Sequence, residues 1–144
     1  MKYTVSIVVK KPKEEVIELF HNPEFYPKWM HGLQKHEVVK GASGKEGTIS
    51  KFYFKMGKRE MEMEEEVLKN NLPDEYIVSY NAKNVYNKVC SRFEELSDGK
   101  TRVYNDQEFQ FKGFMKLMGW MMPGAFKKQS KKYLADFKNF IENE

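Results

Sequence analysis

The C-terminal segment, residues 113–144, constrains the fold most, because most of it has the pattern of a long helix with a single packing face. From residue 126 onward its apolar residues recur at steps of three, four and seven positions, which places them on one side of a helix. These residues are Phe126, Tyr133, Leu134, Phe137, Phe140 and Ile141. Such a helix needs a broad apolar surface to cover, so the rest of the chain must supply one.

The first part of this segment, residues 113–124, is apolar on nearly every side, and Pro123 with Gly124 is expected to break the helix there. Three of its methionines continue toward the later apolar stripe, and they are Met115, Met118 and Met122. Leu117 and Trp120 point the other way, so one core cannot bury them all. Tryptophan beside lysines is typical of lipid interfaces, so residues 113–124 predict a peripheral membrane contact. The alternative is that Trp120 folds back onto the strands or enters a homodimer contact.

Composition limits the classes of protein to which the chain can belong. A length of 144 residues suits one domain, residues 1–144, with a substantial core. The net charge of +4 does not indicate a nucleic-acid binder, so no nucleic acid is expected as a partner. Cys90 is the only cysteine, which fits a reducing compartment, and neither a signal peptide nor a membrane span is recognisable. We therefore expect a cytoplasmic protein that is a monomer or a weak homodimer.

Before the C-terminal segment, the sequence first predicts one strand and two short helices, and then only strands. Residues 3–9 alternate β-branched residues and predict a strand, and residues 14–20 and 24–30 predict two short helices. From Gly32 onward, turn signals separate about six alternating segments. Because these segments follow one another through short turns, they predict an antiparallel meander.

The alternation within these strands assigns their side chains to two faces. One face of residues 48–56, 59–69, 84–96 and 101–111 is mainly Phe, Met and Val, yet it also carries polar residues. These are Glu65, Asn87, Ser91, Asn105 and Gln107. A solid core accepts few such groups, because each needs a partner, whereas a ligand cavity accepts them readily. The alternative is a bulge that shifts the register, or side chains that reach water near strand ends.

Local motifs then suggest a family. Residues 10–33 place Pro12 at the start of a helix, end that helix with Phe20, continue with Asn22-Pro23 and carry Trp29 in the next helix. Together with the order strand, two short helices, six strands and long helix, this resembles the helix-grip fold of the START-like superfamily. That superfamily includes birch-pollen-allergen relatives and the polyketide cyclase/dehydrase and lipid transport branch. These motifs are structural, so they bear on fold more than on activity.

The resemblance implies an α+β fold in which a curved antiparallel seven-stranded sheet wraps around the long C-terminal helix, with two short helices after strand 1. It also implies a hydrophobic cavity between sheet and helix that takes a lipid-like or polycyclic small molecule, with no cofactor. Combined with the strand faces, it predicts these ligand-binding residues: Trp29, Phe52, Phe54, Met61, Met63, Glu65, Asn87, Val89, Ser91, Asn105, Gln107, Phe109, Met115, Met118, Met122, Phe126 and Tyr133. Two alternatives stay open: a cyclase or dehydratase that uses Glu65 and cavity amides, and a protein-interaction module of the chaperone-ATPase-activator kind without a ligand.

Catalytic motifs are scarce. His21, His31 and His36 lack metal-ligand spacing, so no metal site is expected. Cys90 lies on the face opposite the Phe-rich one, which argues against a thiol nucleophile. Glu65 is the one weak catalytic candidate, because a carboxyl group beside methionines has a raised pKa and can act as a general acid or base. The glutamates that alternate with this face predict a solvated surface, and they are Glu60, Glu62, Glu64 and Glu66.

Overall fold

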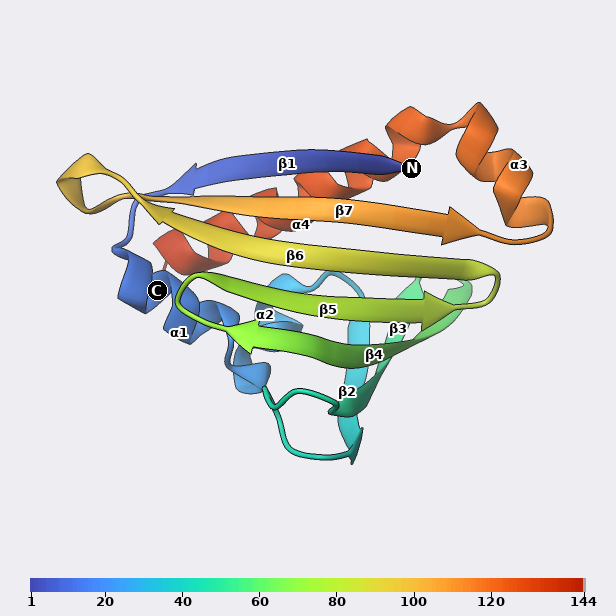
Figure 1. Ribbon diagram of the computed structural model, residues 1–144, viewed down its shortest axis with the longest axis horizontal. Coiled ribbons are helices and arrows are strands. Elements are labelled where there is room, and N and C mark those ends of the chain that lie inside the picture. Colours follow the sequence, from blue (N-terminus) through green and yellow to red (C-terminus); the bar gives the residue numbers. More distant parts are fainter. Residues whose placement is uncertain (144) are drawn as a thin grey trace.

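The computed structural model describes residues 1–143, so Glu144, predicted as the end of the last helix, lies outside the described residues. Seven antiparallel strands form one sheet in the order β1-β7-β6-β5-β4-β3-β2 (Figure 1). The strands are β1 (Lys2–Val9), β2 (Leu33–Lys40), β3 (Ile49–Met56), β4 (Arg59–Asn71), β5 (Glu75–Ala82), β6 (Val85–Glu95) and β7 (Thr101–Phe111). β2 to β7 follow chain order, and β1 closes the set beside β7. The predicted helix-grip sheet is therefore confirmed.

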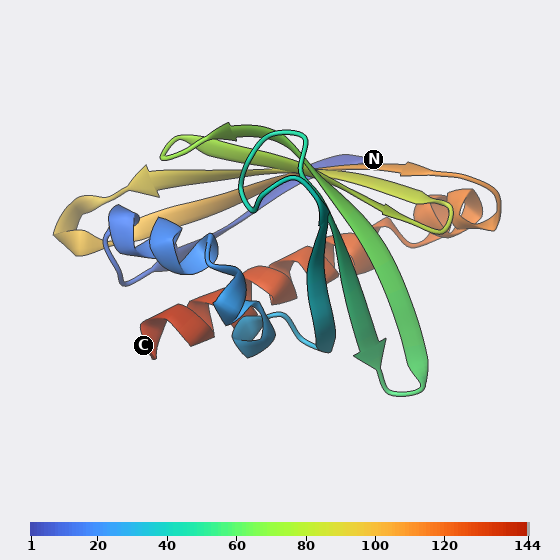
Figure 2. The ribbon, with the colours of Figure 1, turned by 90° about the horizontal axis from the view of Figure 1, so that it is seen from below.

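The helices lie on one side of this sheet. They are α1 (Lys13–Phe20), the 3-10 turn η1 (Pro23–Phe25), α2 (Tyr26–Trp29), α3 (Phe114–Met121) and α4 (Pro123–Glu142), and a second 3-10 turn η2 (Ser97–Gly99) joins β6 to β7. Figure 2 shows α4 running beneath β1 and β7, with α1 and α2 beside its C-terminal half. The β3–β4 hairpin curls toward the helical side, so the sheet is curved around α4.

The sequence predicts one helix over residues 24–30, but the structure has η1 followed by the short α2. The side chain of Asn22 accepts a hydrogen bond from the Glu24 N–H at 3.0 Å, and Pro23 begins a tight turn. Pro27 has no N–H to donate to the carbonyl of Pro23, so the first turn cannot continue as an α-helix. The helix therefore restarts at Tyr26.

The predicted break in the C-terminal helix is confirmed within one residue. Met122 has φ −130° and ψ 52°, which ends α3, and Pro123 is the first residue of α4. Proline suits this position, because the first N–H groups of a helix have no partner within it. The break sets α3 at an angle to α4 (Figure 1).

Between α4 and the sheet, the part covered by α1 and α2 is tightly packed, and we call it the closed end. Its side chains are buried, and they are Val9, Val16, Phe20, Trp29, Phe93, Val103, Leu134, Phe137 and Ile141. The ring centroids of Trp29 and Phe137 are 4.9 Å apart, and those of Phe20 and Phe137 are 5.7 Å apart. The predicted packing face of the C-terminal helix, centred on Phe137, is thus confirmed.

The other part of the interface, toward α3, is less covered, and we call it the open end. It consists of apolar side chains on the helical face of the sheet and on α4 that are only half-buried: Phe54, Met63, Val85, Phe109, Phe111 and Phe126. They share strand faces with buried residues such as Phe52 and Val89. The predicted strand faces are therefore confirmed, and the two ends differ in burial although both are aromatic.

Candidate functional site

A row of polar side chains crosses the middle of the helical face of the sheet. Ser50 of β3 pairs with Glu65 of β4, and Glu65 pairs with Tyr80 of β5. Tyr80 in turn pairs with Asn87 of β6. Directly opposed residues on one face have neighbouring side chains, so these four groups form a continuous row. The row lies between the closed and the open end.

Glu65 is the chemically distinctive member of this row. Burial raises the pKa of its carboxyl group to about 7, although the hydrogen bond with the Tyr80 hydroxyl works in the opposite direction. At neutral pH the group therefore exists in both protonation states, as a hydrogen-bond donor and as an acceptor.

Tyrosines from three elements converge on this carboxyl group. Burial raises the pKa of Tyr26, Tyr76 and Tyr133, and the charge of Glu65 is the second cause in each case. Burial is also the main cause of the raised pKa of Tyr80. These residues belong to α2, β5 and α4, so Glu65 is surrounded by neutral hydroxyl groups.

Amide and hydroxyl groups continue the polar surface toward α4. The Asn87 side-chain amide donates to Gln107 Oε1 at 3.0 Å and to the Glu108 carbonyl at 3.2 Å. The Tyr3 hydroxyl donates to the Phe126 carbonyl at 2.9 Å and shares a 2.7 Å hydrogen bond with Ser130 of α4. These bonds connect β6, β7, β1 and α4, and they give the buried Gln107 and Ser130 hydrogen-bond partners.

Asn105 differs from these neighbours. Its side chain is 1% exposed, and neither amide atom has a hydrogen-bond partner among the residues described. Its cross-strand neighbours are Ser91 on β6 and Val5 on β1. A buried amide without partners costs free energy, so such a group marks a strained or a functional position.

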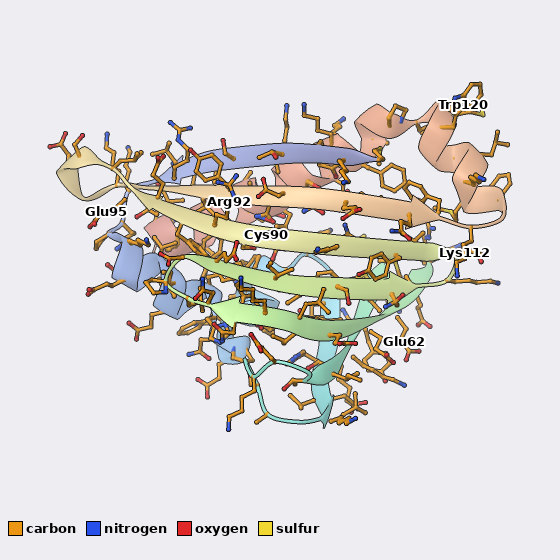
Figure 3. The ribbon with its side chains drawn as sticks, in the orientation of Figure 1. Glu62, Cys90, Arg92, Glu95, Lys112 and Trp120 are labelled. Atoms are coloured by element: carbon orange, nitrogen blue, oxygen red, sulfur yellow. The ribbon has the colours of Figure 1, made fainter. Side chains whose placement is uncertain are left out.

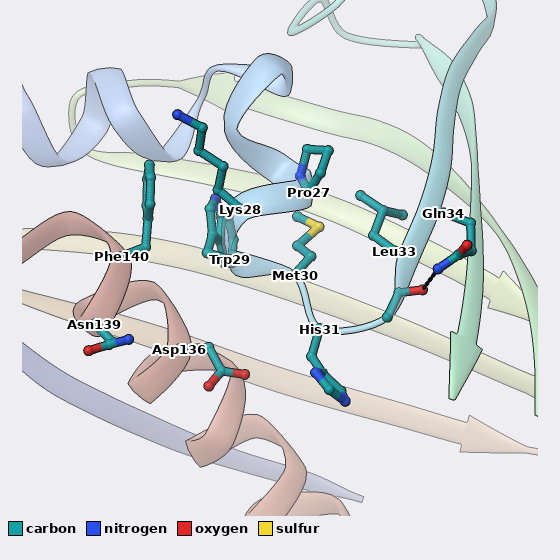
Figure 4. Close-up of a pocket in the computed structure, with 11 residues that line it drawn as sticks. Pro27, Lys28, Trp29, Met30, His31, Leu33, Gln34, Asp136, Asn139 and Phe140 are labelled. Carbon is teal, nitrogen blue, oxygen red and sulfur yellow. Dashed lines mark hydrogen bonds between the residues drawn. The ribbon is translucent and has the colours of Figure 1, made fainter. Parts of the chain in front are cut away.

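Two pockets lie outside the interface between sheet and helix. One, of about 360 Å³, is lined by the α2–β2 connection and by the C-terminal half of α4 (Figure 4). There Trp29 and Met30 face Asp136 and Asn139 across the opening. The other, of about 400 Å³, lies over β1, β7, β6 and β5 around Cys90. Of the predicted ligand-binding residues described, Trp29 alone lines the first pocket and Gln107 alone the second.

The predicted site residues divide into separate groups. The ring centroids of Phe52 and Phe54 are 6.2 Å apart on β3, while those of Phe109 and Phe126 are 5.2 Å apart beside β7, toward the other edge of the same face. The buried residues among the predicted set are Trp29, Phe52, Glu65, Val89, Ser91, Asn105 and Gln107. The half-buried ones are Phe54, Met63, Asn87, Phe109, Met115, Met118, Phe126 and Tyr133, and the exposed ones are Met61 and Met122. Their ligand-binding role stays a prediction.

Sequence reasoning missed three residues of the Glu65 surroundings: Tyr26, Tyr76 and Tyr80. Tyr76 and Tyr80 alternate with Val78 in a segment bounded by turn signals, so their shared face was readable from the sequence. Tyr26 lies within the helix predicted over residues 24–30. Their closeness to Glu65 depends on strand register and helix placement.

Other candidate chemistries find little support. No group of three or more His, Cys, Asp or Glu side chains that could hold a metal occurs within residues 1–143. Cys90 and Arg92 lie on the face of β6 turned away from α4 (Figure 3). Burial and the nearby Glu75 raise the pKa of the Cys90 thiol to about 11, so it is a poor nucleophile at neutral pH. The glutamates that alternate with Glu65 on β4, around Glu62, are exposed, as predicted. Within residues 1–143, no helix is long and apolar enough to cross a membrane.

Comparisons with known proteins agree with this fold. The profile of a family described as polyketide cyclase / dehydrase and lipid transport matches residues 1–142. The crystal structure of Ara h 8.0201 superimposes with a TM-score of 0.80 at 14% identity, covering 100% of this chain and 99% of that chain. The Zhui aromatase/cyclase from Streptomyces sp. R1128 gives 0.80 at 12% identity, covering 99% and 93%. A conserved protein from Geobacillus kaustophilus gives 0.80 at 17%, covering 99% and 96%. At these identities the likeness shows the fold alone, and no curated protein matches the sequence.

Proposed function

The chain belongs to the polyketide cyclase/dehydrase and lipid transport family, and on that premise we propose that it binds a hydrophobic or amphipathic small molecule, lipid-like or polycyclic, between the sheet and α4. The observation that carries the proposal is the half-buried state of the open end. Phe54 and Met63 lie on the helical face of the sheet, and Phe126 lies on α4. All three side chains are only partly buried and so keep contact with solvent. An apolar molecule placed there would remove this surface from water, which stabilises a complex in proportion to the area covered.

The polar row supports an amphipathic ligand over a purely apolar one. Glu65 of this row and Asn105 outside it are more buried than the side chains of the open end, and each can donate and accept hydrogen bonds. A ligand whose apolar body covers the open end and whose hydroxyl or carbonyl group reaches this row matches both surfaces. A few oriented polar groups among apolar walls are typical of small-molecule sites.

A dye titration with a pair of adjacent substitutions tests this proposal. 1-Anilinonaphthalene-8-sulfonate is titrated into the protein, and oleate is added as a competitor. Ala82→Trp places an indole on the half-buried helical face of β5, whereas Asn81→Trp places the same group on the opposite, exposed face. We expect saturable binding with displacement by oleate, a loss of at least about tenfold in affinity for Ala82→Trp, and none for Asn81→Trp.

Two outcomes would contradict the proposal. One is the absence of saturable dye binding in the unmodified protein. The other is equal affinity in both variants, provided that circular dichroism shows both to be folded. Repeating the titration with Trp120→Ser separates this site from the exposed face of α3, because a dye bound to α3 would be lost in that variant while binding at the open end would persist.

A second candidate function is acid–base catalysis at Glu65. The specific observation in its favour is the pKa of about 7, which suits proton transfer at neutral pH. A polyketide-like carbonyl compound is the substrate class that this chemistry and the family suggest. If turnover of such a compound is detected, Glu65→Gln should reduce kcat by a factor of about 100 or more while circular dichroism shows the variant to be folded. Equal kcat in the variant would exclude Glu65 as the acid or base.

A further inference from the structure

Helix α3 presents an apolar face to solvent. The relative exposure of Phe114 is 70% and that of Trp120 is 80%. Half of the large apolar side chains that are exposed within residues 1–143 fall in residues 114–122, and these are Phe114, Leu117, Trp120, Met121 and Met122. The first four lie within one arc of α3 at 100° per residue, so they form a single surface, which we call the outer face of α3. A contiguous exposed apolar face marks an interaction site.

The opposite side of α3 is anchored to the sheet. Gly119 is buried against Phe111 of β7, and a methyl group at this position would come within 2.5 Å of the Phe111 ring. Met115 and Met118 flank it and are half-buried. The absence of a side chain at Gly119 thus lets the helix backbone approach the sheet closely. Consequently the packed side of α3 is already occupied, and no residue among positions 1–143 covers the outer face.

Charge indicates what covers this face. No acidic residue occurs between Glu108 and Asp136, whereas this stretch holds a set of lysines. Those that are exposed and form no ion pair within residues 1–143 are Lys112, Lys116, Lys127, Lys128 and Lys131. Lys132 is bonded to Asp136 at 2.7 Å and is therefore partly neutralised. In Figure 3, Trp120 projects from α3 into solvent at the end of the molecule where Lys112 also lies.

We propose that the outer face of α3, together with the surrounding lysines, docks on a bilayer that contains anionic phospholipids. An apolar face with tryptophan at its edge and lysines around it combines the two attractions that hold a helix at such an interface. A second copy of the chain fits less well, because a two-fold contact through this face would bring lysines against lysines. The proposal rests on α3 and the lysines around it, and it does not require a ligand between sheet and α4.

Tryptophan fluorescence can report docking directly. The chain has two tryptophans, of which Trp29 is buried and Trp120 is exposed. Vesicles of phosphatidylcholine mixed with phosphatidylglycerol are added to the protein at low ionic strength. We expect co-sedimentation, a blue shift of the emission and quenching by brominated acyl chains, all weakened by salt because screening reduces the lysine attraction. Vesicles of pure phosphatidylcholine should bind markedly less protein.

Matched variants assign the effect to this face. Trp120→Ser should lower the partition coefficient at least about tenfold, and Lys116→Glu at least about fivefold. Val39→Ser removes an exposed apolar side chain of β2, and Lys45→Glu reverses an exposed lysine in the loop after β2, so neither should change binding. All four positions are exposed, so the variants are expected to fold.

Three results would overturn the proposal. The first is no sedimentation with anionic vesicles at low salt. The second is binding that Trp120→Ser and Lys116→Glu leave unchanged. The third is a dimer in sedimentation velocity that Trp120→Ser dissociates, because the outer face of α3 would then be a contact between copies of the chain.

Discussion

The closed and open ends of the interface contain similar aromatic side chains, which are buried at the closed end and partly exposed at the open end. At the closed end, Phe20, Trp29 and Phe137 pack ring against ring beneath α1 and α2, and all three are buried. At the open end, Phe109 and Phe126 also contact each other, with centroids 5.2 Å apart, yet both stay partly exposed. The difference comes from coverage, since the short helices lie over only one end of α4 (Figure 2).

This contrast separates stability from binding within one core. Apolar area removed from water stabilises the fold, so the closed end should contribute most of the folding free energy. The half-buried area of the open end contributes less to folding and remains available to a ligand. The polar row around Glu65 lies where the two ends meet. Four substitutions, from the largest expected effect to the smallest, test this division.

The largest effect is expected for Phe137→Ala. Its side chain is fully buried between Phe20 and Trp29, so truncation should cost about 3 to 5 kcal/mol of unfolding free energy. Phe126→Ala, the matched change at the open end, should cost roughly 1 to 2 kcal/mol, because less area is buried there. Urea unfolding followed by circular dichroism measures both. Equal losses would mean that the two ends do not differ in their contribution to stability.

The next effect is a pH dependence carried by Glu65. Its pKa is about 7 in the folded chain against an ordinary value of 4.5, so between these two pH values the folded state holds a proton that the unfolded state has lost. The contribution of Glu65 to stability should therefore fall as pH rises from about 4.5 to about 7, and then level off. The groups facing Glu65 are Tyr26, Tyr76, Tyr80 and Tyr133, whose pKa values are raised further above neutrality, so they do not titrate in this window.

Glu65→Gln should remove this dependence. Relative to the unmodified protein, the variant should gain about 2 to 3 kcal/mol of unfolding free energy between pH 5 and pH 8. Glu62→Gln, an exposed change on the other face of β4, serves as the control and should gain almost nothing. Parallel stability curves for the unmodified protein and Glu65→Gln would show that the carboxyl group is ionised with an ordinary pKa.

A smaller effect is expected for Asn105→Leu. The amide is buried without hydrogen-bond partners, so an apolar side chain of similar volume should stabilise the ligand-free fold by about 1 kcal/mol. If the amide serves a ligand, the same change should weaken binding of an amphipathic competitor more than that of the dye. Asn87→Leu is the comparison, because Asn87 is bonded to Gln107 and should lose stability. Destabilisation by both changes would show that Asn105 has partners in solution.

The smallest effect should come from Gly119→Ala. The added methyl group would press on the Phe111 ring, while alanine favours the helix by about 1 kcal/mol, so the net change in global stability should stay below about 1 kcal/mol. Amide hydrogen exchange within α3 should nevertheless become faster, because the contact with β7 loosens. Gly124→Ala, which meets open space, is the control. Exchange rates that match the control would mean that Gly119 does not anchor α3.

Much of this architecture could be predicted from local patterns. The alternation around Phe52 assigned strand faces, and the spacing around Phe137 assigned the packing side of α4, because side-chain direction repeats with the backbone period. Pro123 marked the break between α3 and α4 for an equally local reason. The local pattern was wrong at residues 24–30, where Pro23 and Pro27 each favour the start of a helical turn. One helix was predicted there, whereas the structure has η1 followed by α2.

The surroundings of Glu65 show where local patterns end. The sequence by itself determined that Glu65 shares a face with Met63, because that depends only on alternation within one strand. The tertiary structure decided that Tyr80, Tyr26 and Tyr133 reach the same carboxyl group, since this depends on the register of β4 with β5 and on how α2 and α4 cross the curved sheet.

The same distinction separates the two aromatic ends. Periodicity predicted that Phe126 and Phe137 both point toward the sheet, and they do. Which of them is shielded from water depends on where α1 and α2 pack, many residues away along the chain. The burial of a side chain depends on all its neighbours in space, whereas periodicity depends only on its neighbours in sequence. For this reason only the folded structure distinguishes the open end from the closed end.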